Sequence, residues 1–379
     1  MPAPRRIAYL SGTRADFGLM ASTLHAIAAD SRLSLGLIVT GMHLSERFGM
    51  TVREIEGEGL SIAARVAVDV NTATGAAMAA NIGHMLVGFV QAMQVHRPDC
   101  LVLLGDRGEM LAGALAAIHL GIPIVHLHGG ERSGTVDEPV RHAISKLANL
   151  HLVATGAARD RLIRMGEEGD TIHIVGAPGL DGLVELATLD RAELCRRVGF
   201  DAASPLALLV YHPVLHEAAA AATQVSDVVE AALACGLQVL ALMPNSDAGS
   251  DAVRETLLEL RRDGRIVLRT HLKRPEFVSW MAAVDVMLGN SSSGIIEAAS
   301  FGTPVVNVGS RQNLRERNVN VTDVLPRAGE VRAGLEAALK HGRYPRLNIY
   351  GDGRAAGRIV ELLATTDWSS DRLVKYNAY

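Results

Sequence analysis

The stretch that decides the fold is residues 101–144, LVLLGDRGEMLAGALAAIHLGIPIVHLHGGERSGTVDEPVRHAI. An apolar run at 101–104 stops at Gly105, and a helical span separates it from a second apolar run at 122–127. This alternation predicts two parallel strands joined by a helix, with both strands ending at one edge of a sheet. In an open parallel sheet, side chains at this edge line the ligand crevice. Those side chains are Asp106, His126, His128, Glu131 and Asp137.

Ionisable groups in such number are costly beside buried strands, because a buried charge must be paired or solvated. A helix cap or a solvated loop charge would explain any one of them. The cluster as a whole predicts a functional site.

Composition limits the class of protein. A chain of 379 residues has room for two domains, and 49% of its residues are hydrophobic but only 4% are aromatic. Its core must then be built from Ala, Val, Leu and Ile, as in sheets covered by helices. With a net charge of −4 and a pI near 6.4, nothing indicates a nucleic-acid partner.

The cysteines and the apolar stretches bear on location. Cys100, Cys195 and Cys235 lie far apart, without metal or disulfide spacing, which suits a reducing cytoplasm. The N-terminal apolar run is too short for a signal peptide, and no uninterrupted apolar stretch is long enough to span a bilayer. We therefore expect a cytoplasmic protein with no membrane partner.

Alternation of apolar runs and helical spans continues through both halves of the chain. Glycine and proline at 176–179 mark a break suited to a domain boundary and a hinge near Ala177. We expect a first domain at 1–176, a second at 177–352, and a C-terminal helix and tail at 353–379 that packs back on the first domain. The expected strands are 6–10, 35–40, 101–104, 122–127, 150–154, 172–175, 206–211, 238–243, 265–268 and 284–288.

Two early turns add candidate site residues. In SGTRADFGL, Ser11 or Thr13 can cap the first helix, and Arg14 can point into the crevice to meet a phosphate or a carboxylate. The alternative for Arg14 is a surface pair with Asp16. His43 follows the strand at 35–40, as either a crevice histidine or a cap of the next helix.

The second half offers an imidazole and an anion-binding turn. Pro213 ends the strand before it and fixes the direction of His212. The turn GNSSSG at 289–294 opens a helix, where backbone amides and serine hydroxyls favour a diphosphate. A serine-rich cap without a ligand is the alternative. Glu297 is placed to accept hydrogen bonds from ribose hydroxyls.

A series of motifs in one order carries a resemblance to a known family. They are TRADFGL, GDRGEML, HLHGGERSGTVDEPVRHAISKLANLHL, YHPV, PNSD and GNSSSGIIEAASFGTPVVNVGSRQ. The sequence resembles the hydrolysing UDP-N-acetylglucosamine 2-epimerases of sialic-acid biosynthesis. This resemblance implies an α/β GT-B fold, with two Rossmann-like doubly wound parallel-sheet domains and a cleft between them. It also implies conversion of UDP-GlcNAc and water to ManNAc and UDP, without metal or redox cofactor.

The resemblance also assigns residues. It makes Asp106, Asp137 and His212 the centre of the chemistry, with His128 and Glu131 as an auxiliary pair. The animal-type members have a glutamate where this sequence has His128, which leaves the identity of one acid or base open. The residues implied to bind the substrate are Arg14, His43, Arg107, Asn245, His271, Ser291, Ser292, Glu297 and Arg311.

The reaction explains these residue types. A base must remove the weakly acidic proton on C2, while cations stabilise the departing diphosphate. Elimination of UDP leaves a 2-acetamidoglucal; water then adds at C1 and a proton returns to the opposite face of C2. We expect Asp106 and Asp137 to flank C2 and C1, and His212 to act as an acid or base near C1 or the leaving oxygen. Which carboxylate removes the first proton stays open.

Several alternatives remain at this point. The same reaction could act on UDP-2,4-diacetamido-2,4,6-trideoxyglucose, or the enzyme could be a non-hydrolysing epimerase. A GT-B glycosyltransferase and a nucleotide-sugar sensor fit the ionisable cluster less well. We expect a homo-oligomer, a dimer or tetramer, although apolar helices such as 78–95 would serve a domain face equally well.

Overall fold

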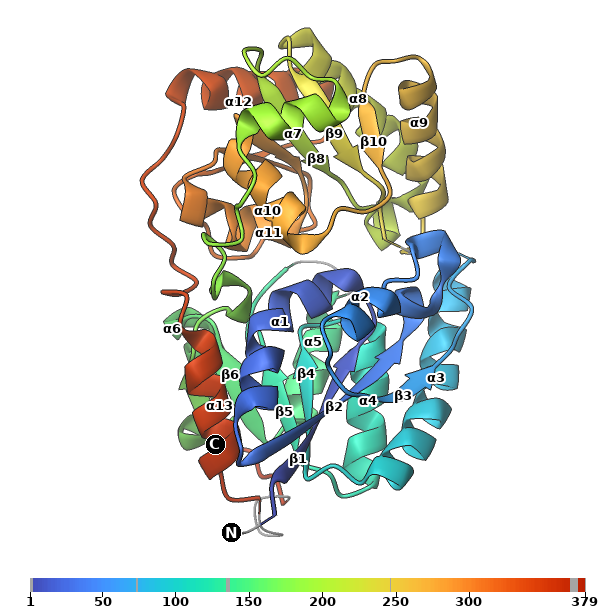
Figure 1. Ribbon diagram of the computed structural model, residues 1–379, viewed down its shortest axis with the longest axis vertical. Helices are drawn as coiled ribbons and strands as arrows, with labels where there is room; N and C mark the ends of the chain where they lie inside the picture. Colours follow the sequence, from blue (N-terminus) through green and yellow to red (C-terminus); the bar gives the residue numbers. More distant parts are fainter. Residues whose placement is uncertain (1–2, 73, 134–136, 246, 369–373, 379) are drawn as a thin grey trace.

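Two parallel sheets, one in each half of the chain, organise the fold (Figure 1). The structure is a computed structural model and describes residues 3–378 except 73, 134–136, 246 and 369–373. In this described part the first sheet has the order β3-β2-β1-β4-β5-β6-β7 and the second the order β10-β9-β8-β11-β12-β13. Strand order reversing from a central strand is the doubly wound Rossmann arrangement, so the expected fold class is confirmed.

Every described strand pairs in parallel with its neighbours. The first sheet contains β1 (Arg5–Ser11), β2 (Leu33–Thr40), β3 (Ile62–Val66), β4 (Cys100–Leu104), β5 (Ile124–Leu127), β6 (Leu150–Val153) and β7 (Ile172–Ile174). The second contains β8 (Leu206–Val210), β9 (Gln238–Leu242), β10 (Val267–Arg269), β11 (Val286–Gly289), β12 (Val305–Val308) and β13 (Val321–Val324).

The α-helices of the described chain alternate with these strands. Those of the first half are α1 (Arg14–Ala29), α2 (Val52–Gly57), α3 (Gly75–His96), α4 (Gly108–His119), α5 (Asp137–Leu147) and α6 (Gly156–Arg164). The remainder are α7 (Arg191–Val198), α8 (Ala221–Ala234), α9 (Ser250–Arg262), α10 (Arg274–Ala283), α11 (Ser292–Ile296), α12 (Ala328–His341) and α13 (Ala355–Thr365).

Helices cover both faces of the first sheet, which is why its central strands are apolar throughout. All five residues of β4 are buried. One face packs on α1 and α13 through residues such as Leu24 and Leu363, and the other packs on α3 and α4 through Phe89 and Met110. The carboxyl ends of these strands face the second domain (Figure 1).

Several strand boundaries differ from expectation, and two strands of the second domain differ at both ends. The strand expected at 265–268 is Val267–Arg269, and the one expected at 284–288 is Val286–Gly289. In the second case the Asp285 carboxylate accepts a hydrogen bond from the backbone N–H of Leu206 at 2.8 Å. This contact anchors the chain just before the ladder begins.

The chain crosses between the domains twice, and both crossings meet at one point. The N–H of Ala177 donates to the carbonyl of Tyr350 at 2.7 Å, beside Gly176 and Gly351. After the second crossing, α13 returns to the first domain and packs along α1 (Figure 1). The ammonium of Lys375 then donates to the carbonyl of Ala148 at 2.6 Å, so this part of the tail also contacts the first domain.

Within the described residues, α3 is long and apolar enough, by length and composition, to cross a membrane. The search of the sequence for an uninterrupted apolar stretch did not find this helix. It packs Met85, Phe89 and Met93 into the first domain against α4 and the sheet. Its role in the fold is therefore that of a covering helix of a doubly wound domain.

Candidate active site

A cavity of about 700 Å³ lies between the two domains, within the size range of sites for small organic ligands. The first domain contributes residues from α1 and α2, and the second contributes residues that follow its strands. Among the predicted site residues, those that line it are Arg14, His212, Asn245, His271, Ser291, Ser292 and Glu297.

A smaller recess of about 80 Å³ adjoins the strand ends of the first domain. Arg107, Asp137 and Asp247 line its polar side. Its other side is mainly apolar, with Met42, Val70, Met78, Ile82 and Met85, and it also includes Asn81.

The turn after β1 fixes the position of Arg14. Thr13 caps α1, and Asp16 reciprocates by accepting from the Thr13 N–H at 2.6 Å, a capping box. A Cβ at residue 12 would collide with the Glu109 side chain, so any residue other than Gly12 would require Glu109 to move. With Asp16 so engaged, the alternative of an Arg14–Asp16 pair is wrong; Arg14 Nη1 donates instead to the Thr270 carbonyl of the second domain at 2.8 Å.

Two histidines expected at the crevice lie instead in the interior of the first domain. The structure does not bring His43 to the cleft: it is fully buried, 2.9 Å from Ser11 Oγ and 2.8 Å from Thr51 Oγ1. His126 is also fully buried, with Nε2 2.7 Å from the Gly105 carbonyl. Burial lowers the pKa of His43 to about 4 and that of His126 to about 3, so both rings are neutral parts of the framework.

Arg107 joins the strand end of the first domain to the second domain. Its Nε donates to Glu109 at 2.8 Å, and its Nη1 lies 3.4 Å from the Asp247 carboxylate. The attraction of Arg107 and Arg311 outweighs burial and lowers the pKa of Asp247. This pair closes the polar side of the recess with compensated charges.

His212 is held in one tautomer. The backbone N–H of Asn245 donates to its Nδ1 at 3.3 Å, which leaves the proton of the neutral ring on Nε2. Burial first, and then the neighbouring Arg311, lower the pKa of His212 to about 3. The ring is therefore a neutral hydrogen-bond donor at the cavity wall.

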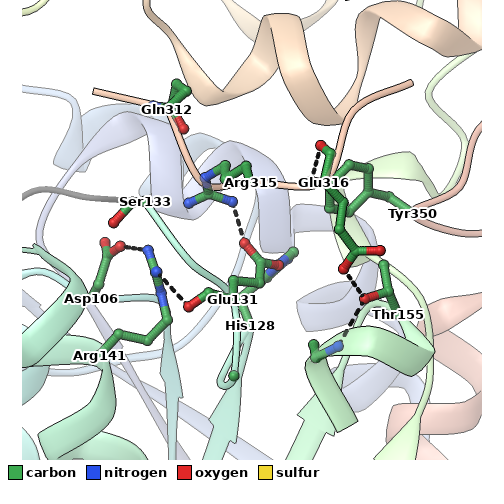
Figure 2. Close-up of polar contacts among 12 residues, drawn as sticks. Asp106, His128, Glu131, Ser133, Arg141, Thr155, Gln312, Arg315, Glu316 and Tyr350 are labelled. Atoms are coloured by element: carbon green, nitrogen blue, oxygen red, sulfur yellow. Dashed lines mark hydrogen bonds and ion pairs between the residues drawn. The ribbon is translucent and has the colours of Figure 1, made fainter. Parts of the chain in front are cut away.

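Asp106 is paired with a fully buried arginine that the sequence did not mark as a site residue. Figure 2 shows the Arg141 guanidinium between the Asp106 carboxylate and the main-chain oxygen of Glu131, to which it donates at 3.0 Å. Arg141 lies on α5, one turn after Asp137. Asp106 and Asp137 are thus fixed through the same helix.

The expected auxiliary pair has a third partner. Glu131 contacts His128 within the first domain and Arg315 from the second (Figure 2). Although burial alone would raise it, the attraction of Arg315 and His128 lowers the pKa of Glu131 to about 2. His128 adopts φ +61°, a left-handed conformation that is strained for a residue with a Cβ.

The expected nucleotide-binding residues cluster in the second domain. Ser291 caps the short helix α11, and its Oγ lies 2.8 Å from Ser293 Oγ. Glu297 is buried and pairs with Arg274 at 2.7 Å. Two further predicted residues have protein partners in this structure: His271 pairs with Glu54 of α2, and Arg311 donates to the Asn290 carbonyl at 3.2 Å.

Sequence reasoning did not assign roles to Arg141, Arg315 or Asp247. Asp247 ends the motif PNSD, so its place after a strand was a signal. Arg315 lies in GSRQNLRERN, whose density of arginine beside Arg311 was another. Arg141 had no such signal, because a basic residue in an amphipathic helix ordinarily faces solvent.

Comparisons with known proteins agree with this architecture. The family model described as UDP-N-acetylglucosamine 2-epimerase matches residues 25–364. The chain belongs to this family. A UDP-N,N'-diacetylbacillosamine 2-epimerase (hydrolyzing) of Legionella pneumophila is 51% identical over 99% of this chain and 100% of its own length. A UDP-N-acetylglucosamine 2-epimerase of Neisseria meningitidis is 31% identical over 92% of this chain and 91% of its own length.

Solved structures share the fold of the family. The crystal structure of UDP-GlcNAc 2-epimerase from Neisseria meningitidis bound to UDP-GlcNAc superposes with a TM-score of 0.80 at 17% identity, over 95% of this chain and 100% of that one. The protein is an enzyme of the hydrolysing UDP-sugar 2-epimerase group.

Proposed function

We propose that the enzyme eliminates UDP from a UDP-2-acetamido sugar and hydrates the resulting glycal, releasing the 2-epimer of the free sugar. This proposal is supported by acids of the first domain and an imidazole of the second that lie where the domains meet. Asp137 lines the recess, His212 lines the large cavity, and Asp106 pairs with Arg141, one helical turn from Asp137. A base on each face of the ring accounts for inversion at C2, because one base cannot serve both faces. Asp106 and Asp137 supply these bases.

His212 acts as a neutral hydrogen-bond donor near the leaving oxygen. Its pKa of about 3 means that no proton is available from an imidazolium at neutral pH. The diphosphate needs charge stabilisation, and a fixed Nε2–H together with Arg311 provides it. His212→Gln, which retains an N–H near this position, should keep more turnover than His212→Ala; equal losses would contradict the donor role.

We propose UDP-2,4-diacetamido-2,4,6-trideoxyglucose as the preferred sugar. The apolar recess beside Arg107 and Asp137 suits the C6 methyl group of this sugar. A hydroxymethyl group would place its hydroxyl against a lining that is mainly methionine and aliphatic side chains. Asn81, the carboxamide among them, already donates to the Asp69 carbonyl at 2.6 Å. The 51% identity to the Legionella pneumophila enzyme supports this choice, and the Neisseria meningitidis relative makes UDP-GlcNAc the second candidate.

The test compares both sugars in deuterium oxide by proton NMR. The kcat/KM for UDP release from the 6-deoxy substrate should be about 10- to 100-fold higher than that from UDP-GlcNAc. This is the range by which an apolar pocket discriminates against an added hydroxyl. Deuterium should appear at C2 of the free manno product. UDP-GlcNAc as the better substrate would overturn the choice of sugar, and a UDP-linked product would instead indicate a non-hydrolysing epimerase.

Met78→Gln tests the recess directly. A polar side chain of similar volume adds a hydrogen-bond partner for a hydroxyl, so the preference should shift toward UDP-GlcNAc. The matched control is Met50→Gln, because Met50 lines the large cavity and not the recess. An unchanged ratio of kcat/KM values in Met78→Gln would place the C6 group elsewhere.

We propose further that the enzyme is cytoplasmic and assembles as a homo-oligomer through α3. All three cysteines are free thiols, as in a reducing compartment. Val87 and Val95 of α3 are 61% and 77% exposed, an apolar surface that a second copy would cover. Light scattering of the wild type and of Val87→Asp tests this, with dissociation expected in the variant.

A further inference from the structure

The segment between β12 and β13 reaches from the second domain to the first. We call residues 310–318 the bridging segment. Its Arg315 pairs with Glu131, and its Glu316 accepts a hydrogen bond from the Thr155 hydroxyl at 2.5 Å (Figure 2). The side chains of Arg315 and Glu131 are only 10% and 4% exposed. The ion pair is therefore buried at the domain interface.

Within the second domain, the bridging segment supports the catalytic imidazole. The Asn290 carbonyl accepts hydrogen bonds from Arg311 at 3.2 Å and from Gln312 at 3.1 Å. The Asn290 carboxamide in turn makes two hydrogen bonds of 2.8 Å with the backbone N–H and carbonyl of His212. The position of the segment is thus coupled to the position of His212.

Within the first domain, Glu131 supports the catalytic carboxylate. Its main-chain oxygen accepts from Arg141, which pairs with Asp106. A continuous series of contacts therefore joins His212 to Asp106. It crosses between the domains at the pair of Arg315 and Glu131.

We propose that Arg315 is a positioning residue that couples domain closure to the assembly of the catalytic groups. By pairing with Glu131 it holds Asp106 and His212 at a fixed separation on the two sides of the cleft. This inference rests on the proposed function, because it assumes that both groups act on one sugar. Arg315 acts through Glu131 and Arg141 and does not itself touch the reacting atoms.

Arg315→Met should lower kcat about 100-fold, the effect of losing reactive geometry, and should leave the Kd for UDP within about two-fold. Arg315→Lys should recover part of the loss, since a lysine keeps the charge but not the forked geometry. The control is Arg265→Met, which removes an exposed arginine paired with Glu230 on the second domain. An unchanged kcat in Arg315→Met would overturn the proposal.

A double-mutant cycle separates positioning from direct catalysis by Glu131. Each single variant leaves the charge of its partner buried and unpaired, which can destabilise the fold. The double variant Glu131→Gln/Arg315→Met removes both charges and therefore controls for misfolding. If the pair acts as a unit, the double variant loses no more kcat than the worse single variant. A further, multiplicative loss in the double variant would show that Glu131 acts on the sugar itself and would overturn the proposal.

Hydrogen exchange provides a readout that does not depend on turnover. Addition of UDP should slow amide exchange at 128–133 in the wild type and in Arg265→Met, but not in Arg315→Met. Equal protection in Arg315→Met would overturn the proposal. If the wild type releases UDP from neither sugar, the proposed function fails, while the exchange result still tests the coupling through Arg315.

Discussion

At the scale of single residues, the site is built from charges that compensate one another. Arg141 is fully buried, with Asp106 as its ion-pair partner, and burial together with the nearby Arg315 lowers the pKa of its guanidinium well below the usual range. Asp106 is therefore the counter-charge of Arg141 in addition to its proposed role as a reacting carboxylate. A substitution at Asp106 should affect stability as well as turnover.

Asp106→Asn should abolish turnover and lower the free energy of unfolding by about 3 kcal/mol, the cost of leaving a buried charge unpaired. UDP binding should persist in calorimetry, because the cavity residues of the second domain are unaltered. Asp106→Asn/Arg141→Gln, measured by urea unfolding, should regain most of the stability but none of the activity. Full stability in the single variant would mean that Arg141 does not need Asp106.

Buried neutral histidines give the protein an acid sensitivity. The folded pKa values of His43, His126 and His212 are about 4, 3 and 3, against about 6.5 when unfolded. The unfolded chain therefore binds more protons below pH 6.5, and stability is lost as the pH falls through that value. Burial raises the pKa of Asp16 to about 6, which offsets part of this loss.

The net effect of these four groups is a loss of about 3 kcal/mol in the free energy of unfolding between pH 7.5 and pH 5.5. Denaturant titrations at several pH values measure it. His126→Gln keeps a donor toward Gly105 but does not titrate, so the stability of this variant should fall about 40% less steeply between these pH values. A slope identical to that of the wild type would show that His126 is not held neutral.

At the scale of elements, apolar runs predicted the central strands because helices cover both of their faces. The strands β3, β12 and β13 were not predicted. β3 and β13 lie at sheet edges, where their residues are largely half-exposed and form no continuous apolar run. β12 is buried, but its run of four residues is interrupted by Asn307. The strand-end rule predicted Asp137, which lines the recess, and Asp106, which pairs with Arg141 of the same helix α5. It misplaced His126, because a histidine within a strand buried on both faces has no polar side to reach.

Contacts between the domains could not be predicted from the sequence. The pair of Arg315 with Glu131 depends on how two separately folded lobes meet, and local spacing carries no information about this. The same holds for Asp181, whose carboxylate accepts hydrogen bonds from the N–H groups of Ala355 at 2.9 Å and Ala356 at 2.5 Å. It caps α13 from a distant part of the chain.

Asp181→Ala should lower the free energy of unfolding by about 1–2 kcal/mol, the usual cost of removing a helix cap. Hydrogen exchange in α13 should increase, because its first N–H groups lose their acceptor. Asp190→Ala is the control. The Asp190 carboxylate caps α7 by accepting a hydrogen bond from the Glu193 N–H at 2.8 Å, so its loss should leave the amide exchange of α13 unchanged. Unchanged exchange in α13 of Asp181→Ala would contradict this capping role.

At the scale of the whole molecule, the first domain consists of two separate pieces of the chain. Ile359 and Leu363 of α13 are fully buried in the same core as β1 and α1. Arg5 of β1 donates to the Leu363 carbonyl at 3.1 Å. Since Gly176 and Gly351 lie side by side, the two pieces could be joined there without the second domain.

We therefore predict that residues 1–177 fused directly to residues 350–379 fold as an independent domain. The fusion keeps α13 on its core and should unfold cooperatively in urea, as a single domain does. Residues 1–176 alone would leave the apolar contact surface for α13 exposed and should aggregate or bind a hydrophobic dye. Circular dichroism and size-exclusion chromatography compare the two chains. Equal stability of both would mean that α13 adds nothing to the core on which it packs.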